Sequence, residues 1–304
     1  MTQAPISDTR ATDQPRLRWK HWFQDRATAA VLRFGALLPY RRKIAVMGWL
    51  GANVIGPAAG LRARIRNNLA LVAPDMPEAE IRHMCRTVPG NMARAIAETF
   101  SGDAFIEHVR HSPVEGDGWD ALMQAKDAGR PVVLVTAHFG NYDAARVVLR
   151  ENGCDIAGIY MPMRNPAFNA RYVAAMEHIA APVFPRDRAG LAGLLKHLRQ
   201  GGMIGLVADH YIAHGELIDF LGQPARTALS SAEIALKQDA LLIPVYAIRQ
   251  PDGVSFRIRV EAPIPHTDPM TMTVALNTSV ENLVRAHMDQ WMWTHKRWKR
   301  NQPR

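Results

Sequence analysis

The chain has 304 residues, of which 48% are hydrophobic and 21% charged, and its formal net charge is +9. This composition excludes a fibrous protein and a disordered one. The excess of basic residues indicates an acidic partner such as anionic lipid, nucleic acid, a phosphorylated substrate or an acidic protein. Cys85 and Cys154 lie far apart without metal-site spacing, so a disulfide framework is not expected.

The N-terminal part of the chain is predicted to be helical. Residues 1–18 are polar with scattered prolines, which predicts a disordered tail, and the first 26 residues lack the apolar core of a secretory signal. A helical part is expected over residues 19–105 and an α/β core over residues 106–304. No repeat or low-complexity linker separates the two parts, so we expect them to form a single domain over residues 19–304.

One segment of the helical part, Ile44–Leu61, is long enough to be considered as a membrane span. Asn53, Pro57 and many Gly and Ala residues make it only weakly hydrophobic. We therefore favour a helix that lies on a membrane surface or packs in the domain over one that crosses a bilayer. The basic residues that flank this segment are Arg41, Arg42, Lys43 and Arg62.

From residue 131 onward, short apolar runs alternate with amphipathic stretches. The expected strands are residues 131–136, 156–161, 181–185, 203–208, 241–249 and 254–261. The expected helices are residues 142–150, 166–178, 189–199 and 231–238. This alternation predicts a mixed central sheet flanked by helices, with the helical N-terminal part packed against it.

The first apolar run ends in the sequence "TAHFGNYD", which places polar groups at the end of a buried strand. His138 is expected at the strand end, Gly140 in a tight turn, and Asn141 as the cap of a helix whose first turn contains Asp143. In the catalytic interpretation, Asp143 accepts a hydrogen bond from one ring nitrogen of His138, and the other nitrogen takes a proton from a bound hydroxyl, which then attacks an acyl carbonyl. A purely structural interpretation, with a helix cap and a favourable first-turn charge, explains the spacing equally well.

Several further segments favour the catalytic interpretation. "HFGNYD" resembles the H-x4-D/E motif of acyltransferases, and the sequence from Leu37 to Arg300 resembles the lipid A biosynthesis late acyltransferases, the lauroyl and myristoyl transferase family. The family commonly has glutamate where this chain has Asp143, and aspartate is usual in the related glycerolipid acyltransferases. The other segments that carry the resemblance are "LPYRRKIAVMGWLG", "RIRNNLALVAPDMPEAEI", "MPMRNPAFN", "LVADHY", "DFLGQPARTALSSAEIALKQDALLIPVYAIR" and "QWMWTHKRWK".

The resemblance implies a fold, a reaction and site residues. His138 and Asp143 become the catalytic pair, while Arg164 and Asp209 fall on motif positions around the substrate groove. Asp209 ends a strand as His138 does, so both are expected at one edge of the sheet. The implied reaction transfers a fatty acyl group from acyl carrier protein to a hydroxyl of an anionic glycolipid, the lipid A precursor. Neither a metal nor a cofactor is required, because a thioester donor is already activated.

The resemblance also implies a location at the cytoplasmic face of the inner membrane, with peripheral or weakly anchored attachment. Two alternatives stay open. The protein could acylate a lysophospholipid or another glycolipid, or it could be a membrane-associated adaptor without catalysis. Mutation of His138 separates these classes, because the adaptor does not need a general base.

Two other patterns were weighed as binding sites. His210 and His214 are four residues apart, which on a helix would offer two metal ligands, but the segment leaves a strand for a loop. Residues 277–300 predict a helix followed by a basic, tryptophan-rich end, with Met288, Trp291, His295 and Trp298 on one helical face. That end suits a membrane interface or a tryptophan-rich core, and we do not expect it to bind nucleic acid.

Overall fold

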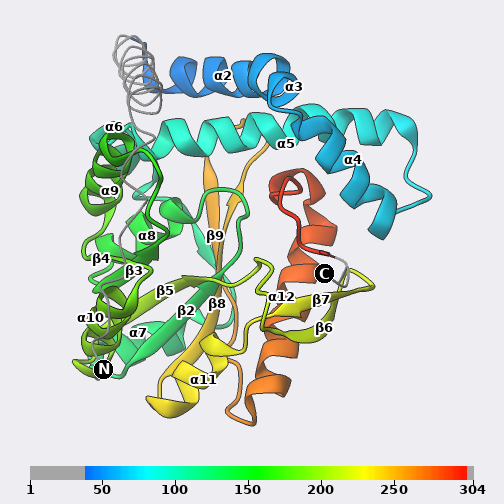
Figure 1. Cartoon of the computed structure of the whole chain (residues 1–304). Helices are drawn as coiled ribbons and strands as arrows, with labels where there is room; N and C mark the ends of the chain where they lie inside the picture. Colours follow the sequence, from blue (N-terminus) through cyan, green and yellow to red (C-terminus); the bar gives the residue numbers. More distant parts are fainter. Residues whose placement is uncertain (1–37, 300–304) are drawn as a thin grey trace, which may run out of the picture.

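The computed structural model describes residues 38–299, and its N-terminal part is helical as predicted (Figure 1). The predicted disordered tail lies outside the described residues. The helices of this part are α2 (Tyr40–Leu50), the π-helical turn η1 (Gly51–Ile55), α3 (Gly56–Ala58), α4 (Leu61–Val72), α5 (Glu78–Thr99) and α6 (Asp103–Val109).

A seven-stranded sheet forms the centre of the molecule, with the strand order β1-β9-β8-β2-β5-β3-β4. Strands β2, β3, β4, β5 and β8 are parallel, whereas β9 is antiparallel to β8. The predicted mixed sheet and all six predicted strands are therefore confirmed. The strands are β1 (Val114–Glu115), β2 (Val132–Thr136), β3 (Ile156–Tyr160), β4 (Val183–Pro185), β5 (Met203–Val207), β8 (Leu241–Arg249) and β9 (Phe256–Val260).

Helices cover both faces of this sheet, and each face has its own apolar core. Buried residues of α6, α7 (Trp119–Asp127) and α8 (Tyr142–Glu151) pack on one face, where α9 (Pro166–Ile179) lies beside α8. Those of α10 (Arg188–Arg199), α11 (Ser230–Lys237) and α12 (Pro269–Ala286) pack on the other. The four helices predicted after residue 131 are confirmed to within one residue at each end.

Two features of the C-terminal half differ from the predictions. A hairpin of β6 (Glu216–Phe220) and β7 (Gln223–Thr227) was not predicted, because neither strand is an apolar run. The helical face predicted over Met288–Trp298 is wrong, since only the short 3-10 turn η2 (Met288–Gln290) follows α12. Trp291 and Trp293 are buried in a core with α4 and α5, so this segment stabilises the fold and its tryptophans do not form an exposed face.

Helix α5 runs across the end of the sheet, and α2 packs along its outer side (Figure 1). The backbones of η1 and α5 approach so closely that a Cβ atom on Gly51 would lie 2.5 Å from the carbonyl oxygen of Pro89. Within residues 38–299, no single helix is both long and apolar enough to cross a bilayer. The stretch Tyr40–Ala58 and α4 meet the length and composition of a span only together, and they are bent by 87°.

Candidate active site

The turn between β2 and α8 has the predicted local structure. Gly140 has a φ of 55°, and a Cβ atom there would lie 2.0 Å from the carbonyl oxygen of Ala247, so both the conformation and the close approach require glycine. The side chain of Asn141 accepts a hydrogen bond from the backbone N–H of Asp143 at 3.0 Å and caps α8. The turn thereby places His138 at the carboxyl end of the parallel strands.

The carboxylate that holds the ring of His138 belongs to Asp209, which follows the neighbouring strand β5. The His138 Nδ1 atom lies 2.8 Å from Asp209 Oδ1, and the backbone N–H of His138 donates to Oδ2 at 3.0 Å. The indole N–H of Trp291 also donates to Oδ2, at 2.8 Å. Burial by itself would raise the pKa of Asp209, but the facing His138 and these hydrogen bonds hold it well below its usual value.

Asp143 does not make the hydrogen bond to His138 that we predicted. One of its carboxylate oxygens accepts from the Thr99 hydroxyl at 2.9 Å, and the other accepts from the Arg146 guanidinium at 2.8 Å. The first turn of α8 faces α5, because Asn141 donates to Glu98 and Asp143 accepts from Thr99, both at the end of that helix. The predicted partner is therefore corrected to Asp209, and Asp143 ties α8 to α5 and to Arg146.

A second buried network fixes the same turn. Glu98, next to Thr99 at the end of α5, accepts hydrogen bonds from the Asn141 side-chain amide at 2.9 Å and from the Arg249 guanidinium at 2.7 Å. Arg249 belongs to β8, and the side chain of Gln290 bonds both its backbone N–H and its carbonyl oxygen. The position of His138 is thus determined jointly by α5, α8, β8 and the segment that follows α12.

Two further histidines form a stack with the ring of His138, and neither was predicted as a site residue. His138 and His210 have ring centroids 3.9 Å apart and planes within 7° of each other. His210 and His295 repeat this arrangement at 3.9 Å and 11°. The Nε2 atom of His295 accepts the backbone N–H of Tyr211 at 3.0 Å, so this imidazole carries its proton on Nδ1.

His210 and His295 are both held in the neutral form. Burial, followed by the charge of His138, lowers the pKa of His210 from 6.5 to about 3. Burial is also the main reason that the pKa of His295 falls from 6.5 to about 4. At neutral pH the stack therefore offers flat, uncharged rings to one face of His138.

Three of these side chains are of types that can bind a metal ion. Ligand atoms of His138, Asp209 and His210 lie within 4.8 Å of one another. A metal ion requires the in-plane lone pairs of its ligands to converge, whereas the two parallel rings direct theirs side by side. His214, which the sequence analysis considered together with His210, is exposed in a loop and lies outside this group.

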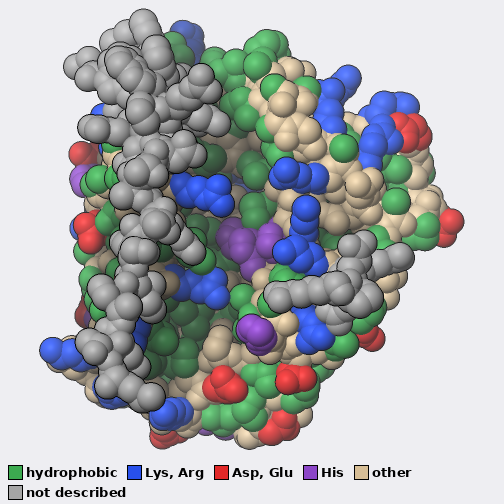
Figure 2. All heavy atoms as spheres, in the orientation of Figure 1, with side chains coloured by type: hydrophobic (Ala, Val, Ile, Leu, Met, Phe, Trp, Pro, Cys, Tyr) green, Lys and Arg blue, Asp and Glu red, His purple; other side chains and the backbone are tan. Residues whose placement is uncertain are grey.

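A large apolar cavity opens beside His138. Its volume is about 1020 Å³, and His138, His210 and Tyr142 form part of its wall. Figure 2 shows the histidine side chains at the centre of a hollow, with Lys and Arg side chains on either side of it. The arrangement thus combines an oriented base with a space that suits a long apolar chain.

The predicted substrate residue Arg164 lies on the surface of the protein. It is exposed in the loop between β3 and α9, next to Met163, which lines the cavity. Of the predicted site residues, the structure therefore brings His138 and Asp209 into direct contact, while Asp143 and Arg164 have other surroundings. Trp291 also touches the pair, and its only signal in the sequence was the segment "QWMWTHKRWK".

Comparison with known proteins identifies the family of this chain. Residues 11–300 match the family described as bacterial lipid A biosynthesis acyltransferase. A lipid A biosynthesis acyltransferase of Haemophilus influenzae is 29% identical, covering 83% of this chain and 81% of that protein. A phosphatidylinositol mannoside acyltransferase of Mycolicibacterium smegmatis is 26% identical, covering 82% and 85%. The lipid A biosynthesis lauroyltransferase of Escherichia coli is 25% identical, covering 78% and 79%. Because the family match extends over most of its length, this chain belongs to the bacterial lipid A biosynthesis acyltransferase family.

Proposed function

We propose that the protein is an O-acyltransferase that moves a fatty acyl group from acyl carrier protein to a hydroxyl of a lipid A precursor. The observation that carries this proposal is the His138–Asp209 pair at the wall of the apolar cavity. The family membership and the relatives that act in lipid A biosynthesis support the acceptor. The net charge of +9 suits both an acidic carrier protein and an anionic glycolipid.

His138 acts as the general base in this reaction. With Nδ1 bound to Asp209, the Nε2 atom takes the proton of the acceptor hydroxyl while its oxygen attacks the thioester carbonyl carbon. The tetrahedral intermediate collapses, the carbon–sulfur bond breaks, and the imidazolium returns the proton to the leaving thiolate. The products are the ester and the free thiol of the carrier, so no oxidant, metal or nucleotide is consumed.

Donors to the negative oxygen of the intermediate come from side chains. The backbone N–H groups of His138, Phe139 and Gly140 are already bonded, to Asp209, Ala137 and Gln290 respectively. Arg164 lies in the loop that borders the cavity and presents a planar fork of donors. We assign it to the oxyanion or to a phosphate of the acceptor.

The proposal is tested by incubating the purified protein with acyl carrier protein thioesters and a lipid A precursor. We expect the mass of the glycolipid to rise by one acyl group, measured by mass spectrometry. Lipids from cells that lack the protein provide the complementary measurement, and their lipid A should lack one acyl chain. A normal lipid A from those cells, together with no transfer in vitro, would contradict the proposed acceptor.

A second acceptor class has a specific observation in its favour. The relative from Mycolicibacterium smegmatis, a phosphatidylinositol mannoside acyltransferase, matches over as much of the chain as the lipid A enzymes do. An acyltransferase for another glycolipid or for a lysophospholipid would use the same pair and the same cavity. In that case the cells that lack the protein keep normal lipid A, and a different lipid class loses an acyl chain.

We further propose that α2 and η1 attach the protein to the surface of the inner membrane at its cytoplasmic face. Trp49 is 60% exposed on this stretch, with Val46, Val54 and Ile55 also exposed. Two exposed arginines, Arg41 and Arg42, begin the same helix. Exposed apolar groups beside cations are the combination that binds an anionic lipid surface.

Replacing Trp49 by alanine should weaken binding to vesicles that contain phosphatidylglycerol by roughly tenfold, because a large apolar surface is lost from the interface. Co-sedimentation measures the partition coefficient. Leu217→Ala is the matched control, since Leu217 is 57% exposed on the hairpin at a different surface. Equal losses for both variants, or no loss for either, would rule out α2 as the attachment site.

A further inference from the structure

The cavity enters the sheet where two neighbouring strands separate. Strands β5 and β3 pair from Met203–Ile156 to Gly205–Gly158 and no further. Beyond this point β5 remains paired with β2 as far as Val207, while β3 continues beside β4. Side chains from both sides of this split line the cavity: Ile159, Tyr160, Leu206 and Val207.

Two glycines at the start of the split leave a hollow on the face that α8 covers. Leu134, Gly205 and Gly158 are register partners on β2, β5 and β3, so they form one row across the sheet and share one face. Of these three residues, only Leu134 has a side chain beyond the backbone, and the row continues to Ile243 on β8 and Val183 on β4. These three residues form part of the cavity wall, and residues of α8 form the wall that faces them.

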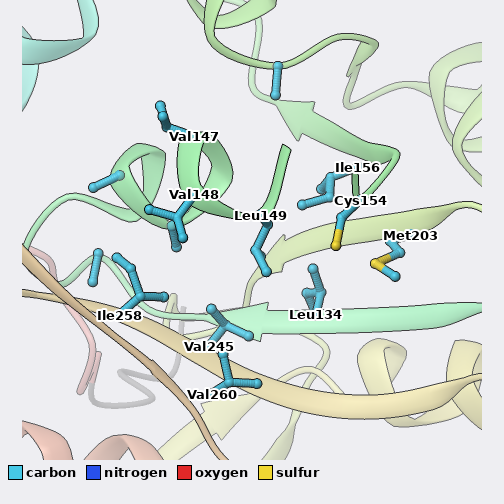
Figure 3. Packing of buried hydrophobic residues seen from close by; sticks show 14 of the residues in the cluster. Leu134, Val147, Val148, Leu149, Cys154, Ile156, Met203, Val245, Ile258 and Val260 are labelled. Atoms are coloured by element: carbon cyan, nitrogen blue, oxygen red, sulfur yellow. The ribbon is translucent and has the colours of Figure 1, made fainter. Parts of the chain in front are cut away.

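The next row closes the hollow. Its members, Val132, Met203 and Ile156, have fully buried side chains. Leu149 of α8 points toward the strand that carries Leu134 (Figure 3). Leu134, Leu149 and Ile156 all line the cavity. The distance along β2 from His138 to Leu134 is about 13 Å for four residues in extended conformation.

The glycines provide space and are not needed for the backbone conformation. Neither Gly158 nor Gly205 has a positive φ. A Cβ atom on Gly205 would have its nearest neighbours at 3.9 Å, in ordinary contact, so a larger side chain there would extend into the cavity. A Cβ atom on Gly158 would lie 3.3 Å from Val183 and 3.6 Å from the Arg146 guanidinium, which Asp143 holds in place.

We infer that Gly205 determines the length of the acyl chain that the protein accepts. This inference rests on the proposed function. The chain runs from the carbonyl at His138 over the row of Gly205 and Gly158 and ends against Leu149 and Ile156. Leu134, Thr136 and His138 are every second residue of an extended segment, so their side chains lie on one face of the sheet. The path of the acyl chain therefore continues on the face from which the base acts.

The test is a series of Gly205 variants, namely Gly205→Ala, Gly205→Val and Gly205→Leu, assayed with acyl carrier protein thioesters that differ by two carbons. The longest chain that the wild type uses well should lose at least about tenfold in kcat/KM in Gly205→Val, because each excluded methylene is worth about fourfold. A chain two to four carbons shorter should keep its rate. Gly205→Ala should shift the profile less, and its 3.9 Å clearances make it the variant that retains the fold.

Ile204→Val is the control, because Ile204 lies on the same strand but faces the opposite core. It should leave the dependence on chain length unchanged. An unchanged profile in Gly205→Val, or an equal loss for all chain lengths, would overturn the inference. If the acyl chain instead enters the cavity on the side of the sheet that α10 covers, the dependence on chain length should not change in Gly205→Val.

Fatty-acid binding separates this inference from the proposed reaction. Displacement of a fluorescent fatty acid by straight-chain acids of increasing length reports on the cavity without catalysis. One outcome is that Gly205→Val binds shorter fatty acids best, while neither the wild type nor the variant transfers acyl groups. The proposed function then fails and the assignment of Gly205 stands. If transfer occurs with the wild-type length profile, the proposed function stands and the assignment fails.

Discussion

Replacing His138 by alanine is expected to lower acyl transfer from acyl carrier protein by at least about a hundredfold, the usual scale for the loss of a general base. The side chain is 25% exposed at the cavity wall, and Asp209 keeps the Trp291 hydrogen bond without it, so the fold should persist. Transfer is measured with labelled acyl groups, and the thermal unfolding midpoint confirms that the variant is folded. His214→Ala, an exposed histidine in the loop after β5, should retain wild-type activity.

Unchanged transfer in the His138 variant would show that His138 is not the general base and would contradict the proposed mechanism. Absence of transfer in the wild type as well would favour a membrane-associated adaptor. Fatty-acid binding distinguishes a lost base from a collapsed cavity. It should be the same in the variant and the wild type, because His138 is only one of many residues in the cavity wall.

Asp209→Asn should lower the rate by about a thousandfold or more, with a small effect on KM, because it reverses the tautomer of the base. The carboxylate accepts from the His138 and Trp291 groups, whereas an amide also donates. An amide N–H facing Nδ1 would force the imidazole proton onto Nε2, which then cannot accept the substrate proton.

The equivalent change at Asp143 should have a different signature. Asp143→Asn breaks its buried ion pair with Arg146, and we expect the free energy of unfolding to fall by about 3 kcal/mol. Transfer per folded molecule should fall far less than in Asp209→Asn. If Asp143→Asn instead abolishes transfer in a stable protein and Asp209→Asn does not, then Asp143 orients the base and our assignment is reversed.

Local patterns predicted most of the fold. Six strands and the helices between them follow from hydrophobic periodicity, and the turn at Gly140 and Asn141 follows from the turn and capping preferences of those residues. The hairpin of β6 and β7 escaped because its residues alternate between buried and exposed positions without an apolar run. The spacing of the C-terminal tryptophans predicts a helical face, but these residues are buried by contacts with α4 and α5. Those helices are distant in sequence, so local spacing does not reveal the contacts.

The candidate site shows the same limit. His138 was identified by its position at a strand end, and Asp209 was expected at the same sheet edge. The hydrogen-bonded partner was nevertheless misassigned, because a spacing of five residues favours Asp143 while Asp209 is 71 residues away. Only the adjacency of β2 and β5 in the sheet reveals the correct pair, and strand order cannot be read from local periodicity.

Helix α5 contacts both the N-terminal helices and the turn that carries His138. Its outer side receives α2, and its end holds Asn141 and Asp143 through Glu98 and Thr99. If α2 rests on lipid as we propose, the general base stands at a fixed height above the bilayer. Only hydroxyls of the acceptor that protrude to that height can be acylated, so the depth of a lipid in the membrane would contribute to selecting the position that is modified.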